Sequence, residues 1–361
     1  MAQQYTDEKA RINGQALLSV KNLTIDFKSE GRIVRAVDGV SFKVDRGKTL
    51  CVVGESGCGK SVTSLAIMGL LPTPPAIIAG DEVNLGDTDL LALGPAAMRR
   101  VRGDRIAMIF QEPMTSLDPV YTIGDQIVEA IKAHENISTE KAMERALELL
   151  KRVRIPEPNE RLRQYPHNLS GGMRQRVMIA IALACNPELL IADEPTTALD
   201  VTIQAQILDL ITQLKDQLGM ALMLITHDLG VVAQVADEVV VMYAGQVVEK
   251  APAEGLFDTP QHPYTLGLLG SIPRVDEQRP ELATIKGRVP PPFDMPKGCR
   301  FHPRCPFAQE KCLQQPELAL VGQDHWAACW RSPLEQHILG WQPTDCEARA
   351  PGGTSPDSLG D

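Results

Sequence analysis

A glycine-rich loop at residues 54–61 constrains the fold of this chain more than any other feature. Its sequence, Gly-Glu-Ser-Gly-Cys-Gly-Lys-Ser, follows an apolar run at 49–53 that is typical of a buried strand, and precedes a run at 62–68 that is typical of a helix. This succession of strand, loop and helix gives weight to the pattern G-x-x-x-x-G-K-[ST]. The glycines let the backbone curl so that several N–H groups face a phosphate chain, and the helix N-terminus adds further donors. The pattern therefore predicts a site for a nucleotide's phosphates.

Two side chains of this loop have distinct expected roles. Lys60 should reach the β- and γ-phosphates of the nucleotide, and the hydroxyl of Ser61 should bind Mg²⁺. The alternative is an ordinary glycine turn before a helix, which would not need every anchor position of the pattern. The predicted nucleotide-binding residues here are Gly54, Glu55, Ser56, Gly57, Cys58, Gly59, Lys60, Ser61 and Val62.

Composition and charge bound the class of protein. The chain has 361 residues, enough for two domains, and its 43% apolar and 23% charged residues are typical of a soluble globular protein. No apolar run approaches the ~18 residues of a membrane-spanning helix, and the N-terminus lacks the features of a signal peptide. The net charge of −10 argues against a nucleic-acid surface. We therefore expect a cytoplasmic protein that binds no nucleic acid.

The first half of the chain predicts two subdomains beside an α/β core. Strand-forming residues at 17–27 and 33–44 indicate a small antiparallel sheet next to the nucleotide loop. Apolar residues at helical spacing in 123–134 and 138–153 indicate amphipathic helices. These helices predict a helical subdomain at about residues 112–168.

The second half predicts the rest of the core and a C-terminal addition. Strands and helices alternate from residue 172 onward, which implies a mostly parallel sheet covered on both faces. After Lys250 the proline density rises and periodicity fades. We expect a nucleotide-binding domain at 17–250 after an N-terminal tail at 1–16. A separate C-terminal appendage should follow at 251–335, and a flexible tail at 336–361.

An acidic pair, Asp193 and Glu194, directly follows the apolar strand at 189–192. At the carboxyl end of a strand one carboxylate can hold Mg²⁺ beside the phosphates, while its neighbour can orient the attacking water or accept its proton. Paired acids also occur as solvated turns. Their position after a strand, in a chain with a phosphate loop, favours the functional interpretation.

A second anion site is predicted at residues 169–173, Leu-Ser-Gly-Gly-Met. Ser170 can cap a helix, and Gly171 and Gly172 leave its first N–H groups uncovered. One chain hardly needs two cradles for one triphosphate. Two chains arranged head to tail do, because each could offer its capped helix to the nucleotide held by the other.

Taken together, these motifs resemble the ATP-binding subunits of ABC transporters over residues 17–250. The resemblance implies a P-loop NTPase core of the ABC type that hydrolyses ATP with Mg²⁺. The matching segments are the Walker A loop at 54–61, the Q-loop residue Gln111, the signature at 169–173, the Walker B strand at 189–193, the catalytic Glu194, the D-loop at 198–200 and the switch residue His227. Cys58 departs from the serine common in the family, where this side chain points away from the phosphates.

The resemblance assigns roles that the residues alone only suggest. Glu194 would polarise the attacking water, and His227 would contact the γ-phosphate, although a lone histidine after a strand is more often structural. Gln111 would sense Mg²⁺ and nucleotide and couple the site to a membrane partner. Asp200 would face the second subunit. Phe27 stands at the family's adenine-stacking position, with an ordinary core phenylalanine as the alternative.

Four further segments resemble the oligopeptide/dipeptide (also nickel) importer branch, with the dipeptide importer ATPase favoured. They lie at 111–119, 165–167, 242–245 and 262–265. The branch implies a subunit at the cytoplasmic face of the inner membrane that energises peptide import. Its partners would be a second ATPase, more often a paralogue than a copy, two membrane permeases and an external peptide-binding protein. Alternatives are a different cargo such as nickel, a soluble ABC ATPase in translation or DNA repair, or a catalytically silent partner subunit.

The C-terminal segment contains four of the chain's eight cysteines. A cytosolic setting favours metal binding or burial over disulfides. Their spacing lacks the paired C-x2-C of common zinc sites, and four thiolates suit a cubane cluster. Zinc and free or buried thiols stay as alternatives, while the branch that the chain resembles carries a 4Fe–4S cluster here. The expected ligands are Cys299, Cys305, Cys312 and Cys329.

Overall fold

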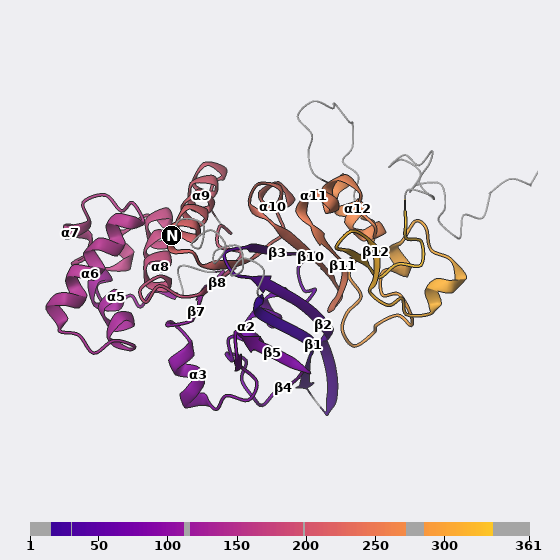
Figure 1. Cartoon of the computed structure of the whole chain (residues 1–361), viewed down its shortest axis with the longest axis horizontal. Helices are drawn as coiled ribbons and strands as arrows, with labels where there is room; N and C mark the ends of the chain where they lie inside the picture. Colours follow the sequence, from indigo (N-terminus) through magenta and orange to yellow (C-terminus); the bar gives the residue numbers. More distant parts are fainter. Residues whose placement is uncertain (1–15, 30, 112–115, 198, 272–284, 335–361) are drawn as a thin grey trace, which may run out of the picture.

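The computed structural model has an α/β fold built on two sheets, which confirms the predicted fold class of the core (Figure 1). The tails predicted at 1–16 and 336–361 lie outside the described residues, apart from Ala16, as does Ala198 of the D-loop. The described residues are 16–29, 31–111, 116–197, 199–271 and 285–334.

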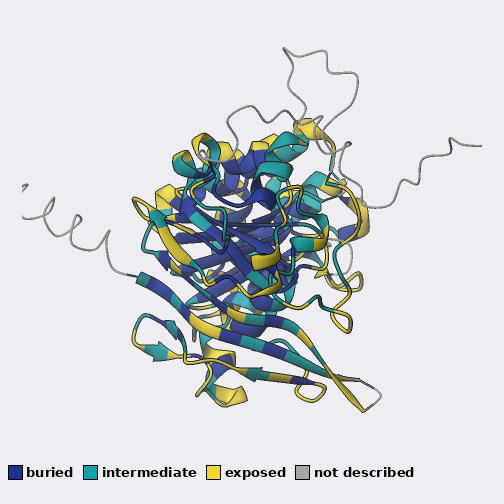
Figure 2. Ribbon diagram, turned by 90° about the vertical axis from the view of Figure 1, so that its right-hand side faces the viewer, coloured by how far each residue is buried: buried dark blue, intermediate teal, exposed yellow. Residues whose placement is uncertain are grey.

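The larger sheet forms the core of the molecule. Its strands are β3 (Thr49–Val53), β7 (Ile106–Ile109), β8 (Leu189–Asp193), β9 (Ala221–Thr226), β10 (Glu238–Tyr243), β11 (Gln246–Pro252), β12 (Ala319–Gly322) and β13 (His325–Ala327). Their order is β12-β13-β11-β10-β3-β9-β8-β7, and the strands from β10 to β7 run parallel. Every residue of β3, β8 and β9 is buried, as a strand covered on both faces requires. Figure 2 shows this buried interior.

The helices of the core follow the parallel strands. They are α2 (Lys60–Ile67), α8 (Gly171–Ala182), α9 (Val201–Leu218) and α10 (Leu229–Val235). Because β3, β8 and β9 are parallel neighbours, their carboxyl ends meet at one edge of the sheet. The nucleotide loop, Glu194 and His227 leave the sheet at this edge.

A second sheet packs beside the nucleotide loop, where the sequence predicts an antiparallel subdomain. It contains β1 (Ala16–Ser29), β2 (Arg32–Asp45), β4 (Ala76–Ala79), β5 (Glu82–Leu85) and β6 (Thr88–Asp89), and α3 (Pro95–Val101) follows it. All of its pairings are antiparallel. Burial alternates along much of β2, so one face of this sheet covers a core and the other faces water.

The predicted helices of the insert are present as a separate lobe, at the left of Figure 1. They are α5 (Ile123–Lys132), α6 (Thr139–Arg152) and α7 (Pro158–Arg161). The hydroxyl of Ser138 accepts a hydrogen bond from the backbone N–H of Lys141 and so caps α6. Within the part of the chain that the structure describes, no helix is long and apolar enough to cross a membrane.

The C-terminal segment is not structurally separate from the domain before it, contrary to the expectation of an independent appendage. It contributes α11 (Ala253–Asp258), α12 (Pro263–Gly270) and short 3-10 turns at 302–304 and 310–313. Its strand β13 pairs with β11 through Lys250 and Trp326, so the segment extends the core sheet. The low periodicity of this sequence hides the pairing, because each strand is only three or four residues long.

Candidate nucleotide-binding and hydrolysis site

The glycine-rich loop has the curled backbone that the sequence predicts. Gly54 has a φ of 150°, and a Cβ placed there would lie 2.2 Å from the carbonyl oxygen of Met242. Gly59 is left-handed, with a φ of 102°, and forms the N-cap of α2. Only glycine suits these positions, because a side chain would meet backbone or strain the loop. The loop thus leaves the N-terminus of α2 uncovered for a phosphate group.

Lys60 lies inside this loop. It is buried, and its Nζ donates hydrogen bonds to the carbonyl oxygens of Gly54 and Glu55, at 2.7 and 3.1 Å. The thiol of Cys58 is also buried, with its Sγ 3.8 Å from this amine, and burial raises its pKa. Cys58 therefore packs beneath the loop as a neutral side chain.

Two predicted Mg²⁺ residues lie together at the end of β8. The Ser61 hydroxyl donates a hydrogen bond of 3.0 Å to Oδ1 of Asp193. Burial raises the pKa of Asp193, and the neighbouring Glu194 carboxylate acts in the same direction. A carboxylate in such a place gains from a divalent cation, and the hydroxyl–carboxylate pair is a donor set that Mg²⁺ accepts.

Glu194 is the centre of the predicted catalytic group. Its φ of 46° turns the chain sharply after β8, and its N–H donates to the carbonyl of Ile225 on β9 at 2.9 Å. Its Oε2 accepts hydrogen bonds of 3.0 Å from Gln111 Nε2 and from Thr197 Oγ1. Its Oε1 lies 3.5 Å from His227 Nδ1. The structure therefore brings Gln111, Glu194 and His227 together from three strand ends.

Thr197 is a residue of this group that the sequence did not single out. Its only sequence signal is its position three residues after Glu194, within one turn of chain. The two hydrogen bonds to Oε2 leave Oε1 for the exposed His227, whose side chain is 67% exposed.

The signature and D-loop residues form a second group, on α8 and α9. Ser170 caps α8 by accepting a hydrogen bond from the N–H of Met173, and Asp200 caps α9 in the same way through Ile203. A Cβ on Gly172 would lie 3.1 Å from Ile203 Cγ2. Ser170 and Asp200 are both exposed, so their helix ends are open to a partner.

Phe27 is half-buried on β1, where it pairs with Val34 of β2 and Ala76 of β4. Its ring packs partly against the core of the antiparallel subdomain. Both its expected roles, as a core residue and as a stacking platform, agree with this half-burial.

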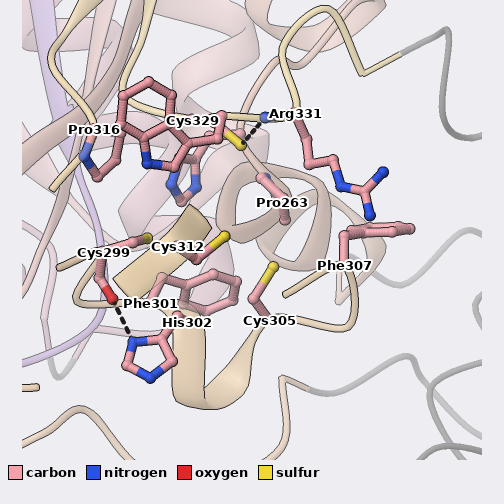
Figure 3. A pocket seen from close by; sticks show the side chains of 12 residues that line it. Pro263, Cys299, Phe301, His302, Cys305, Phe307, Cys312, Pro316, Cys329 and Arg331 are labelled. Atoms are coloured by element: carbon pink, nitrogen blue, oxygen red, sulfur yellow. Dashed lines mark hydrogen bonds between the residues drawn. The ribbon is translucent and has the colours of Figure 1, made fainter. Parts of the chain in front are cut away.

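The four C-terminal cysteines line one small pocket, although they are spread over 31 residues of sequence (Figure 3). The neighbouring thiols of Cys299, Cys312 and Cys329 add to the effect of burial in raising the pKa of Cys305. Burial raises the pKa of Cys305, and that of Cys329 to about 11. Among the described residues, no group of three or more His, Cys, Asp or Glu side chains could hold a metal ion, so the structure does not support the predicted 4Fe–4S site.

The glycine-rich loop after β3, the Ser61–Asp193 hydrogen bond and the hydrogen-bonded Glu194 are features of a P-loop ATPase, and comparisons with solved structures agree. The chain resembles the dimeric ATP-binding cassette MJ0796 bound to ADP and Pi, with a TM-score of 0.58 and 29% identity over 65% of this chain and 98% of that one. An ATP-binding subunit of an ABC transporter matches with a TM-score of 0.54 and 27% identity over 66% of this chain and 91% of that one.

Sequence comparisons identify the branch. Residues 37–197 match the ABC transporter family, and residues 248–312 match the oligopeptide/dipeptide transporter C-terminal region. A probable peptide ABC transporter ATP-binding protein, y4tR of Sinorhizobium fredii, is 55% identical over 88% of this chain and 95% of its own length. The dipeptide transport ATP-binding protein DppD of Haemophilus influenzae is 52% identical over 85% of this chain and 93% of its own.

The chain therefore belongs to the ABC transporter ATP-binding family, in the branch that carries the oligopeptide/dipeptide transporter C-terminal region. It is an ATPase of this family, and the expected resemblance is confirmed. Oligopeptide transport ATP-binding protein AppD of Bacillus subtilis, 54% identical over 84% of this chain and 92% of its own length, falls in the same group.

Proposed function

We propose that this ATPase energises the import of dipeptides or oligopeptides through a multisubunit transporter. The carrying observation is the assembly of Gln111, Glu194 and His227 at the end of the parallel sheet. The names of the relatives support peptides as the cargo. Nickel or another small solute is the alternative cargo, because selection would occur in subunits outside this chain.

ATP hydrolysis in this site is phosphoryl transfer to water, in which positioning and charge neutralisation supply most of the catalysis. Lys60 exchanges its bonds to the loop carbonyls for phosphate oxygens when nucleotide enters. Ser61 and Asp193 would hold Mg²⁺, which would neutralise charge on the phosphates. Glu194 orients the attacking water, and Gln111 and Thr197 hold its carboxylate in place.

The site is completed by a second ATPase subunit placed head to tail. Ser170, Gly171 and Gly172 of each subunit would cover the nucleotide held by the other, and Asp200 would lie at the same interface. The exposure of Ser170 and Asp200 supports this arrangement, and MJ0796 is itself a dimer. A paralogue is the expected partner. Two membrane permeases and an external peptide-binding protein would complete the complex at the cytoplasmic face of the inner membrane.

Two rival functions are less well supported. A soluble ABC ATPase of translation or DNA repair would usually carry two ATPase halves or a long insertion, which differs from the short helical lobe here. A catalytically silent subunit would not need a hydrogen-bonded Glu194 with His227 beside it.

The import function is tested in cells that depend on this transporter, with a radiolabelled dipeptide and with ⁶³Ni²⁺ as separate cargoes. Wild-type cells should take up the dipeptide, and cells with Glu194→Gln should not, although the subunit is made in the same amount. Nickel uptake that depends on Glu194, with no dipeptide uptake, would transfer the proposal to the alternative cargo.

The cysteine pocket is the proposed site of a 4Fe–4S cluster with a structural role. Four thiols around one pocket match the donor set of such a cluster. A zinc ion is less well supported, because the spacing of these cysteines lacks the paired C-x2-C of common zinc sites. The protein purified without oxygen should contain iron and acid-labile sulfide, and Cys305→Ser should lower both. Stoichiometric zinc without iron would replace the cluster by a zinc site.

A further inference from the structure

The cysteine-containing segment contacts the phosphate-binding loop directly. Arg304 donates two hydrogen bonds to the Glu55 carboxylate, from Nη1 to Oε2 at 2.6 Å and from Nη2 to Oε1 at 2.9 Å. Glu55 is the second residue of the glycine-rich loop, and Arg304 comes 249 residues later. Two parallel bonds between a guanidinium and a carboxylate are strong and fix the orientation of both groups.

The surroundings hold Arg304 in this position. Its side chain is only 6% exposed, and its remaining donors contact the carbonyl oxygens of Ile285, Lys286 and Gly287. Its guanidinium lies 5.7 Å from the centre of the Tyr243 ring. Because these contacts fix the guanidinium of Arg304, its hydrogen bonds also fix the position of the Glu55 carboxylate in the loop.

A tyrosine of the same region holds the backbone of Glu55. The N–H of Glu55 donates a hydrogen bond of 2.7 Å to the hydroxyl of Tyr264, on α12. The Tyr264 ring is fully buried against Tyr243 and Phe301, and Phe301 lies in the same segment as Arg304. Figure 3 shows Phe301 beside the cysteine pocket. Both the backbone and the side chain of Glu55 are therefore fixed by residues after position 252.

Glu55 places a negative charge inside a loop that must accept a triphosphate. Two anions at short range repel each other strongly where water is partly excluded. An unpaired carboxylate at this position would therefore oppose nucleotide binding, and a paired one would not. No residue of the glycine-rich loop other than Lys60 carries a positive charge, and Lys60 bonds the loop carbonyls.

We propose that Arg304 is a positioning residue of the ATP site, which neutralises Glu55 and fixes the glycine-rich loop in its phosphate-binding shape. The C-terminal region is then part of the nucleotide site rather than an accessory to it. This inference rests on the ATP-binding role of the family and is independent of the cargo and of any metal in the cysteine pocket.

The test is a charge-rescue series on the full chain, measured by displacement of mant-ATP with MgATP. Arg304→Ala should weaken MgATP binding by about tenfold, because it leaves Glu55 unpaired. Glu55→Gln, which removes the carboxylate charge, should bind MgATP more tightly than Arg304→Ala does. The double variant Arg304→Ala/Glu55→Gln should recover affinity to within about threefold of the wild type.

Two further measurements separate charge from loosened structure. Measured without Mg²⁺, the loss caused by Arg304→Ala should fall in the order ATP, ADP, AMP, because the repulsion depends on the phosphate charge and that charge decreases along this series. Arg145→Ala, which breaks the Glu135 ion pair in the helical lobe, is the matched control and should bind MgATP like the wild type. If the arginine variant is poorly folded by circular dichroism, Arg304→Lys keeps the charge and should bind more tightly than Arg304→Gln.

Each failure has a definite meaning. Unchanged MgATP binding in a folded Arg304→Ala chain would overturn the proposal. So would a double variant that binds as weakly as Arg304→Ala, because the contact would then serve only structure. Equal losses for ATP and AMP, both measured without Mg²⁺, would also overturn it. In each of these cases mant-ATP binding to the wild type would still show that the family role is intact.

Discussion

The phosphate-binding loop and the cysteine-containing segment that contacts it are both irregular chain, but they are held in different ways. The loop at 54–61 lies between a buried strand and a helix that are its immediate neighbours in sequence. The segment at 299–305 has only a 3-10 turn, and it is fixed by side chains from far along the chain, such as Glu55 and Tyr243. Structure that depends on neighbours in the sequence can be predicted from a sequence pattern. Structure that depends on contacts between distant residues can be seen only once the fold is known.

The sharpest prediction for the loop side of this comparison concerns Glu194. Glu194→Gln keeps the shape of the side chain but removes the base that orients water, so ATP turnover should fall by ~10²–10⁴-fold. MgATP affinity should stay close to that of the wild type, because Gln111 and Thr197 still hold the side chain. Phosphate release by the assembled transporter measures the turnover, and mant-ATP displacement measures the affinity.

Glu148→Gln, on the exposed surface of α6, is the control for this variant and should hydrolyse ATP normally. Hydrolysis by Glu194→Gln at the wild-type rate would remove the catalytic role of this residue. A parallel loss of MgATP affinity would instead assign Glu194 to binding.

The same contrast explains how far the sequence predicts this structure. Gly54, Ser61 and Glu194 could be placed because each follows a strand that an apolar run marks, and the carboxyl ends of parallel strands meet. The helical lobe followed from apolar spacing alone. The motifs themselves predicted phosphates and Mg²⁺ as ligands, and the resemblance added ATP hydrolysis for a transporter.

The rest could not be predicted, for physical reasons. β13 is three residues long, so its pairing with β11 leaves no periodic signal, and the segment was expected to be separate. Arg304 lies in a proline-rich stretch, and an arginine there is ordinarily expected on the surface. Its hydrogen bond to Glu55 joins residues that are 249 positions apart in the sequence. Thr197 needs the turn after β8 before its hydroxyl can reach Glu194.

The second prediction tests the long-range contacts that attach the C-terminal segment to the core sheet. Glu249 of β11 is fully buried, and its carboxylate accepts hydrogen bonds from the backbone N–H groups of Gln261 and His262 and contacts His325 Nε2 at 2.7 Å. Glu249→Gln puts an amide NH₂ where donors already point, so the free energy of unfolding should fall by about 3 kcal/mol. Urea denaturation followed by tryptophan fluorescence measures this, since Trp326 lies next to His325 in β13.

Glu148→Gln again provides the control, because its ion pair with Lys151 is exposed and should leave the urea midpoint unchanged. An unaltered midpoint in Glu249→Gln would mean that the C-terminal segment is attached to the sheet by packing, and that the carboxylate is not the anchor.

The smallest expected effect concerns Phe27, whose position agrees equally with a core residue and with a residue that stacks on adenine. Phe27→Leu keeps an apolar side chain against the subdomain core but removes the flat ring, so a residue that stacks on adenine should lose about 0.5–1.5 kcal/mol of MgATP affinity. Binding of magnesium tripolyphosphate, which has no base, should stay unchanged in the same variant. Phe42→Leu, a fully core substitution on β2, serves as the control and should lower stability without separating the two ligands. Equal changes for ATP and tripolyphosphate in Phe27→Leu would make this residue a core phenylalanine, because a ring that never meets the base cannot distinguish a nucleotide from its phosphates.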